Sequence, residues 1–162
     1  MKAGSLPALL LLSTCLVSGC FNAHLYPVQG PLASQTPPPI YAAKVVGAFN
    51  SGKVSATLAN GEVFAGPWKA ISVKERAAQS AAGKQPAFSL SAAWDTVYGP
   101  GFYTAHVLGT RLFAQATLTG SHGTALQMEM YRHEHPGDAA APAIDVKGVA
   151  KDDQGNIYKL AF

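Results

Sequence analysis

Apolar and polar residues alternate along much of the chain from residue 41 onward, a period of two that is typical of half-buried β-strands. Val54, Ala56 and Leu58 share one face of such a strand, and the segments 112–118 and 126–130 alternate in the same way. Asn60-Gly61 predicts a two-residue hairpin turn, because both residue types tolerate positive φ. The pattern therefore predicts paired antiparallel strands.

Six strand-like segments form three successive hairpins, and a further strand over 41–48 precedes them. The hairpins join 53–58 to 62–68, 111–119 to 124–132 and 143–150 to 157–162. We predict a mainly β, antiparallel fold of about seven strands, either a sandwich or a partly open barrel. The roughly 120 residues of 41–162 suffice for one such domain and are too few for two.

Two stretches depart from the alternation and predict one or two short helices. Leu90, Trp94, Val97 and Tyr98 are spaced to share one helical face, with Gly99 as the stop signal. We expect this helix to lie across a face or an end of the sheet with its tryptophan buried. The segment 73–84 is helix-prone without a strong apolar stripe, so it is either a short helix or a loop. The segment 103–108 is expected to be the next strand.

The first nineteen residues have the pattern of an export signal. Lys2 supplies a positive charge, an uncharged and mostly apolar run follows to Val17, and the small residues Ser18 and Gly19 come next. A membrane-spanning helix needs roughly 20 consecutive apolar residues. This run is shorter and contains Pro7, which favours a signal peptide, 1–19, over a permanent span.

The residues Val17-Ser18-Gly19-Cys20 resemble the lipobox of bacterial lipoproteins. The resemblance implies that the Cys20 thiol receives a diacylglyceryl group, that the signal is cut between Gly19 and Cys20, and that a fatty acid such as palmitate is added to the new amine. The alternative is a cysteine that follows an ordinary signal by chance. The sequence has two cysteines, and the other leaves with the signal, so the mature chain would form no intrachain disulfide.

Residues 20–40 are predicted to be the acylated cysteine and a proline-rich tether, ahead of a β domain over 41–162. Five prolines disfavour helix in this stretch. Fully extended, it would span about 60 to 70 Å. Its apolar content over 25–32 leaves open the alternative that it lies along the domain as an irregular arm.

The residue after the cysteine is Phe21, and this bears on which membrane holds the protein. In the enterobacterial sorting pattern that this resembles, an aspartate at this position retains a lipoprotein in the inner membrane. Its absence favours the outer membrane, with the domain on the periplasmic face.

The net charge is +3, or +2 once Lys2 has left with the signal, and the basic residues form no stripe, which excludes a nucleic-acid partner.

The segment Arg132–Asp138 is the one cluster with metal-ligand chemistry. His133 and His135 would point to the same face of an extended strand, and His106 or His122 would supply a third nitrogen for Zn or Cu. The alternative is the polar end of a strand that runs into a loop, because the H-E-x-x-H spacing is absent.

Four segments, 25–32, 51–68, 97–110 and 148–162, resemble small proteobacterial lipoproteins of this length. The resemblance covers most of the mature chain and supports lipid attachment, but it implies no particular reaction. No catalytic triad, phosphate loop or calcium loop is present in the sequence.

We therefore expect a membrane-anchored lipoprotein whose non-enzymatic β domain binds an envelope protein or a small hydrophobic ligand. The alternative is a periplasmic metal-binding protein or enzyme that uses His133 and His135. A carrier of lipid or of another hydrophobic ligand would require a cavity inside the sheet.

Overall fold

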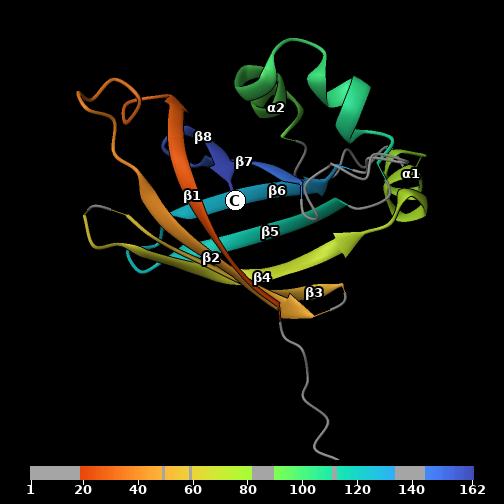
Figure 1. The fold of residues 1–162 in the computed structure, drawn as a ribbon, viewed down its shortest axis with the longest axis horizontal. Coiled ribbons are helices and arrows are strands. Elements are labelled where there is room, and N and C mark those ends of the chain that lie inside the picture. The colour runs from red at the N-terminus through yellow and green to blue at the C-terminus, as the bar shows by residue number, and fades with distance from the viewer. Residues whose placement is uncertain (1–18, 49, 59, 82–89, 111–112, 134–144) are drawn as a thin grey trace, which may run out of the picture.

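The computed structural model describes residues 19–48, 50–58, 60–81, 90–110, 113–133 and 145–162. Eight antiparallel strands, each hydrogen-bonded to its neighbours in sequence, close into a barrel in which the last strand pairs with the first (Figure 1). The strands are β1 (Gly19–Gln29), β2 (Tyr41–Ala48), β3 (Ser51–Thr57), β4 (Val63–Ile71), β5 (Phe113–Gly120), β6 (Ala125–Arg132), β7 (Val146–Asp152) and β8 (Ile157–Ala161). The helical segments are α1 (Val73–Ala81), α2 (Ser91–Tyr98) and the π-helical turn η1 (Tyr103–Val107).

The predicted mainly β, antiparallel fold and its three hairpins are confirmed. The sheet closes on itself, so the described strands form neither a sandwich nor a partly open barrel. The strand that sequence reasoning missed is β1. Phe21, Ala23 and Leu25 alternate with polar or exposed residues, and Ala23 and Leu25 are buried in the barrel core. This alternation satisfies the rule for a half-buried strand despite the prolines that follow.

The expected tether over 20–40 is wrong for its first half. Cys20 is paired with Val46 of β2, and Leu25 is paired with Leu160 of β8. Residues 30–40 then connect β1 to β2, and the backbone N–H of Leu32 donates to Asn156 Oδ1 at 2.9 Å. Cys20 is thus part of the barrel wall. The predicted signal peptide, apart from Gly19, lies outside the described residues.

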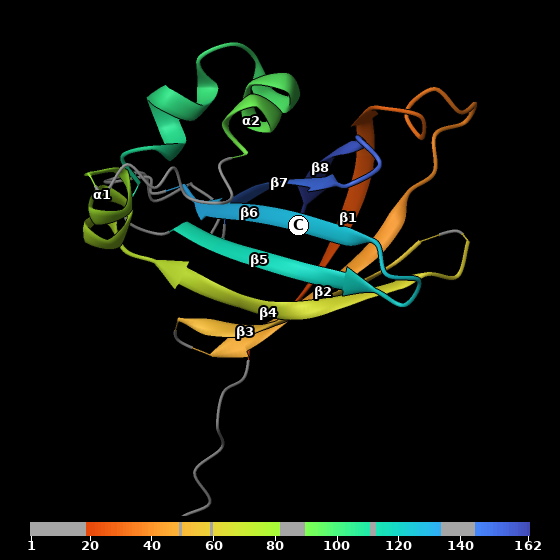
Figure 2. The ribbon, with the colours of Figure 1, turned by 180° about the vertical axis from the view of Figure 1, so that it is seen from behind.

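The expected helix near residues 90–98 is confirmed as α2, which together with η1 covers the part of the sheet's outer face around β7 and β8 (Figure 2). Trp94 is fully buried, and Tyr98 and Phe102 stack against its ring at 5.5 and 6.1 Å between centroids. The expected strand at 103–108 is wrong. This segment forms η1 because Val107 packs into the same outer cluster as Trp94 instead of pairing with a strand.

A buried carboxylate fastens α2 to the barrel. Glu129 of β6 is 1% exposed and accepts hydrogen bonds from the backbone N–H of Leu90 (3.2 Å), from Trp94 Nε1 (2.7 Å) and from Gln115 Nε2 (3.2 Å). Desolvation at this position raises the pKa of Glu129, although the three donors oppose that shift. The helix is therefore held by directional bonds as well as by apolar packing.

Of the segment 73–84, Val73–Ala81 forms the helix α1, and 82–84 lie outside the described residues. Its start is a capping box: Ser72 Oγ accepts from the backbone N–H of Glu75 at 3.2 Å, and Glu75 Oε2 accepts from the backbone N–H of Ser72 at 2.9 Å. The guanidinium of Arg76 donates to the backbone carbonyls of Val107 and Thr110 and thereby ties α1 to the end of η1.

Candidate ligand-binding site at the open end of the barrel

The two ends of the barrel differ in what fills them. At one end β1, β3, β5 and β7 begin and β2, β4, β6 and β8 finish, and we call this the open end. At the opposite end, the closed end, lie the connection 30–40 and the turns after β3, β5 and β7. The helix α1 follows β4 directly and therefore lies at the open end (Figure 1).

A cavity of about 550 Å³ occupies the open end. Its wall combines aromatic and aliphatic side chains from six strands and the C-terminal residue. The larger apolar members that follow the inward alternation of their strands are Phe21, Val45, Trp68, Met130, Val146 and Phe162. A concave, mostly apolar pocket of this size is typical of a site for a small molecule.

The cavity exists because three of the inward positions at this end are small. Gly47, Ala70 and Ala114 line it, and Ala70 and Ala114 face each other across the β4–β5 pair. The corresponding inward positions toward the closed end are large, among them Tyr158 and Phe64, which are almost fully buried. The same alternating pattern therefore gives a packed core at one end and a hollow at the other.

Trp68 forms one wall of the cavity, and two glycines make room for it. Its Nε1 donates to the backbone carbonyl of Val46 at 3.0 Å. A Cβ atom on Gly52 would lie 2.5 Å from that nitrogen, and one on Gly47 would lie 2.6 Å from the indole ring. Any larger residue at either position would displace the indole, so these glycines fix the shape of the wall.

The rim of the cavity is polar and has two basic side chains and one acidic one. Among the described residues that line it, the charged side chains are those of Lys69, Arg132 and Glu75. Lys69 Nζ lies 3.5 Å from Glu75 Oε1, and both side chains are well exposed. Arg132 ends β6 at a position that continues the inward alternation of Met128 and Met130. An amphiphile with an anionic head group fits such a rim.

The closed end is filled by a hydrogen-bonded polar network. Asp152 is 5% exposed, and its carboxylate accepts from the backbone N–H groups of Gln154 and Asn156, from Asn156 Nδ2 and from the hydroxyl of Tyr158 at 2.7 Å. Burial, reinforced by the adjacent Asp152 carboxylate, raises the pKa of Tyr158 above its ordinary value. The pocket at this end measures about 170 Å³ and has walls of mixed polarity.

A third hollow, about 470 Å³, lies outside the barrel between α2 and the strands β6 and β7. Its charged residues are Lys151, Asp152 and Asp153, and both carboxylates already accept hydrogen bonds within or beside the β7–β8 turn. The open end is the stronger candidate because its walls are more apolar and its inner surface belongs to the barrel itself.

The structure brings only part of the predicted histidine cluster together. His133 follows β6 near the open end, and its ring centroid lies 6.4 Å from that of His106 in η1. His122 lies at the closed end, with Nδ1 3.9 Å from Glu62 Oε2. It is therefore excluded as a ligand shared with His133, because β6 separates the two. His135 lies outside the described residues.

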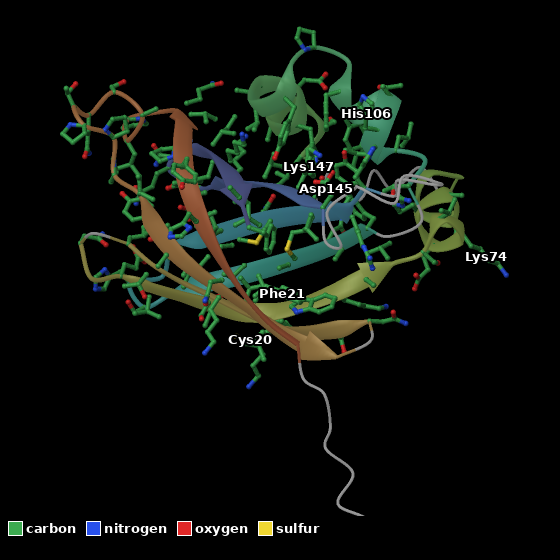
Figure 3. All side chains as sticks on the ribbon, in the orientation of Figure 1. Cys20, Phe21, Lys74, His106, Asp145 and Lys147 are labelled. Atoms are coloured by element: carbon green, nitrogen blue, oxygen red, sulfur yellow. The ribbon has the colours of Figure 1, made fainter. Side chains whose placement is uncertain are left out.

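The carboxylate nearest in sequence to this histidine pair is already engaged. Asp145 Oδ1 and Oδ2 each lie 3.0 Å from Lys147 Nζ, and the backbone carbonyl of Asp145 accepts from the N–H of His133 (Figure 3). Within the described part of the chain, no three histidine, cysteine or acidic side chains are grouped as metal ligands would be.

Cys20, the predicted lipid-attachment residue, is exposed at the beginning of β1 beside Phe21 (Figure 3). Its side chain points to the outside of the barrel, whereas the next residue contributes to the cavity wall. None of the helices in the described residues has the length and apolarity needed to cross a bilayer.

Comparison with family models, with curated proteins and with solved structures gave no significant match.

Proposed function

We propose that the protein is a lipid-anchored envelope protein whose barrel is a non-enzymatic binding module for a small hydrophobic ligand. The observation that supports this most directly is the cavity of about 550 Å³ at the open end. Its volume lies within the range of about 300 to 1,000 Å³ that ligand pockets occupy. Each ligand methylene transferred from water into such a pocket contributes roughly 0.8 kcal/mol, so an alkyl chain is a suitable occupant.

Energy transfer from Trp68 tests ligand binding. All eight strands lie within residues 19–162, so this chain is titrated with a fluorescent polyene fatty acid. We expect saturable quenching of tryptophan emission. The quenching should be weaker in Trp68→Phe, because the remaining Trp94 lies outside the barrel, between α2 and the outer face of the sheet.

Two double variants, each replacing two alanines by leucine, distinguish ligand binding in the cavity from adsorption to the protein surface. Ala70→Leu with Ala114→Leu fills the cavity from two facing positions and should abolish the transfer. The control is Ala42→Leu with Ala65→Leu, which adds the same groups to exposed positions on the outer face. Equal binding by both double variants would refute the proposed site.

Anchoring at the outer membrane, on its periplasmic face, is the second part of the proposal. It is supported by the resemblance of 17–20 to a lipobox and by the exposure of the Cys20 side chain. We expect Cys20→Ala to block incorporation of a labelled fatty acid and to leave an uncleaved precursor. Undiminished label on that variant would contradict the assignment.

A metal-binding role that uses His133 with His135 remains the second candidate, and the neighbouring ring of His106 favours it. Titration of zinc or copper into the chain and into a His106→Ala, His133→Ala variant tests it. We expect a difference in uptake only if these imidazoles bind the ion together.

A further inference from the structure

The predicted anchor and the mouth of the cavity lie at the same end of the molecule. Cys20 is the second residue of β1, and Phe21, the next residue, lines the cavity (Figure 3). The C-terminal Phe162 lines the same mouth. Since Cys20 is itself paired with Val46, a lipid on its sulfur would be joined to the barrel without an intervening spacer.

Large apolar side chains remain exposed around this mouth. Phe21 is 40% exposed, Phe162 is 42% exposed, and Val73 at the start of α1 is 44% exposed. Each borders the cavity or follows a residue that lines it. Aromatic rings and a valine at the edge of an apolar cavity are suited to contact the interface of a bilayer.

The distribution of charged residues also distinguishes the open end from the closed end. Lys69, Lys74 and Arg132 lie at the open end, where Glu75 is the single carboxylate side chain among the described residues that line the cavity and the nearby Asp145 is paired with Lys147. The closed end instead has three acidic residues, Glu62, Asp152 and Asp153, in or beside its turns, with Lys151 next to them. Basic groups are attracted to an anionic membrane surface, so the open end is the end that such a surface attracts.

From these observations, and resting on the proposed function, we infer that the open end lies on the bilayer that holds Cys20 and that the cavity takes up an acyl chain of an anionic phospholipid from that bilayer. The apolar wall would hold the chain, and Lys69 and Arg132 at the rim would face the phosphate. The closed end points away from the membrane. The ligand thus enters without crossing water, because anchor and mouth are adjacent.

Coupling the protein to vesicles from a chosen end tests this orientation. In residues 19–162 Cys20 is the only cysteine, so it can be joined to a maleimide-bearing lipid in vesicles of anionic phospholipid. The matched control carries Cys20→Ser and Gln154→Cys, which moves the attachment to an exposed turn at the closed end. The vesicles contain phospholipid with brominated acyl chains, which quench a tryptophan on contact.

We expect loss of most Trp68 emission when attachment is at Cys20, and no loss when attachment is at Gln154→Cys. The Ala70→Leu, Ala114→Leu variant attached at Cys20 should keep its emission, and the emission of Trp94 reports that this variant is folded. Replacing the anionic phospholipid by a zwitterionic one should weaken the quenching.

Equal quenching from both attachment points would overturn the orientation. Quenching that persists in the filled variant would overturn uptake of the chain, and quenching that is independent of lipid charge would overturn the role of the basic rim. If Trp68 is not quenched from Cys20 while the polyene fatty acid still binds in solution, the inference fails and the proposed function stands. If that fatty acid does not bind, the proposed function itself fails.

Discussion

The two ends of this barrel are built from the same eight strands, yet one is filled and the other is hollow. At the closed end Tyr158 and Phe64 occupy the interior, and Asp152 satisfies four donors around them. At the open end Gly47, Ala70 and Ala114 leave a cavity of about 550 Å³. Residue size at inward positions, rather than strand pairing, therefore separates a packed half of this barrel from a hollow half, to which we assign ligand binding.

The largest expected effect of a substitution is at the closed end. Asp152→Ala leaves Tyr158 and Asn156 with buried donors that have lost their acceptor, and such groups cost about 1 to 3 kcal/mol each. We expect a loss of about 3 to 5 kcal/mol in the free energy of unfolding, measured by urea denaturation. The control is Asp153→Ala in the same turn, whose exposed hydrogen bond to the Ala125 N–H should cost under about 1 kcal/mol. Similar losses in the two variants would remove the stabilising role of the closed end.

Alkaline pH should weaken the closed end through Tyr158. Its pKa is raised above the ordinary value of 10.0, so the neutral hydroxyl stabilises the fold fully below pH 10. As the pH rises beyond 10, the unfolded chain loses this proton and the folded chain keeps it, and stability falls by up to about 1.4 kcal/mol per pH unit. Urea denaturation between pH 9 and pH 11, with pH steps of about one unit, should show a shallower decline for Tyr158→Phe. Identical slopes would contradict the network described for Asp152.

Filling the open end should have the smallest effect on stability. Ala70→Leu with Ala114→Leu adds apolar groups to empty space, so we expect the free energy of unfolding to change by less than about 1.5 kcal/mol. Ligand binding should nevertheless be lost, which separates the two halves by function. A loss of stability as large as that of Asp152→Ala would show that the cavity walls are already packed together.

Much of the barrel could be predicted from the alternation of apolar and polar residues alone. The period of two identified β2 to β8 because each strand has one buried face, and the helical spacing of Leu90, Trp94 and Tyr98 identified α2. The strand β1 was missed because the prolines of 27–39 outweighed the short alternation of Phe21, Ala23 and Leu25.

The cavity was beyond prediction from sequence. Gly47, Ala70 and Ala114 come together only through pairing around the closed barrel, and no local pattern identifies which end of a strand is hollow. The expected strand at 103–108 was wrong for a related reason. Packing of Val107 in the outer cluster outweighed its β-propensity, and only tertiary structure creates that cluster.

The most direct test of the two-ended barrel is a titration of the isotope-labelled chain with a fatty acid, followed by NMR of the backbone amides. Chemical shifts should move at Phe21, Trp68, Met130 and Phe162, while those of Asp152, Asn156 and Tyr158 stay in place. Shifts confined to the closed end, or spread evenly over the eight strands, would contradict a binding site at the open end.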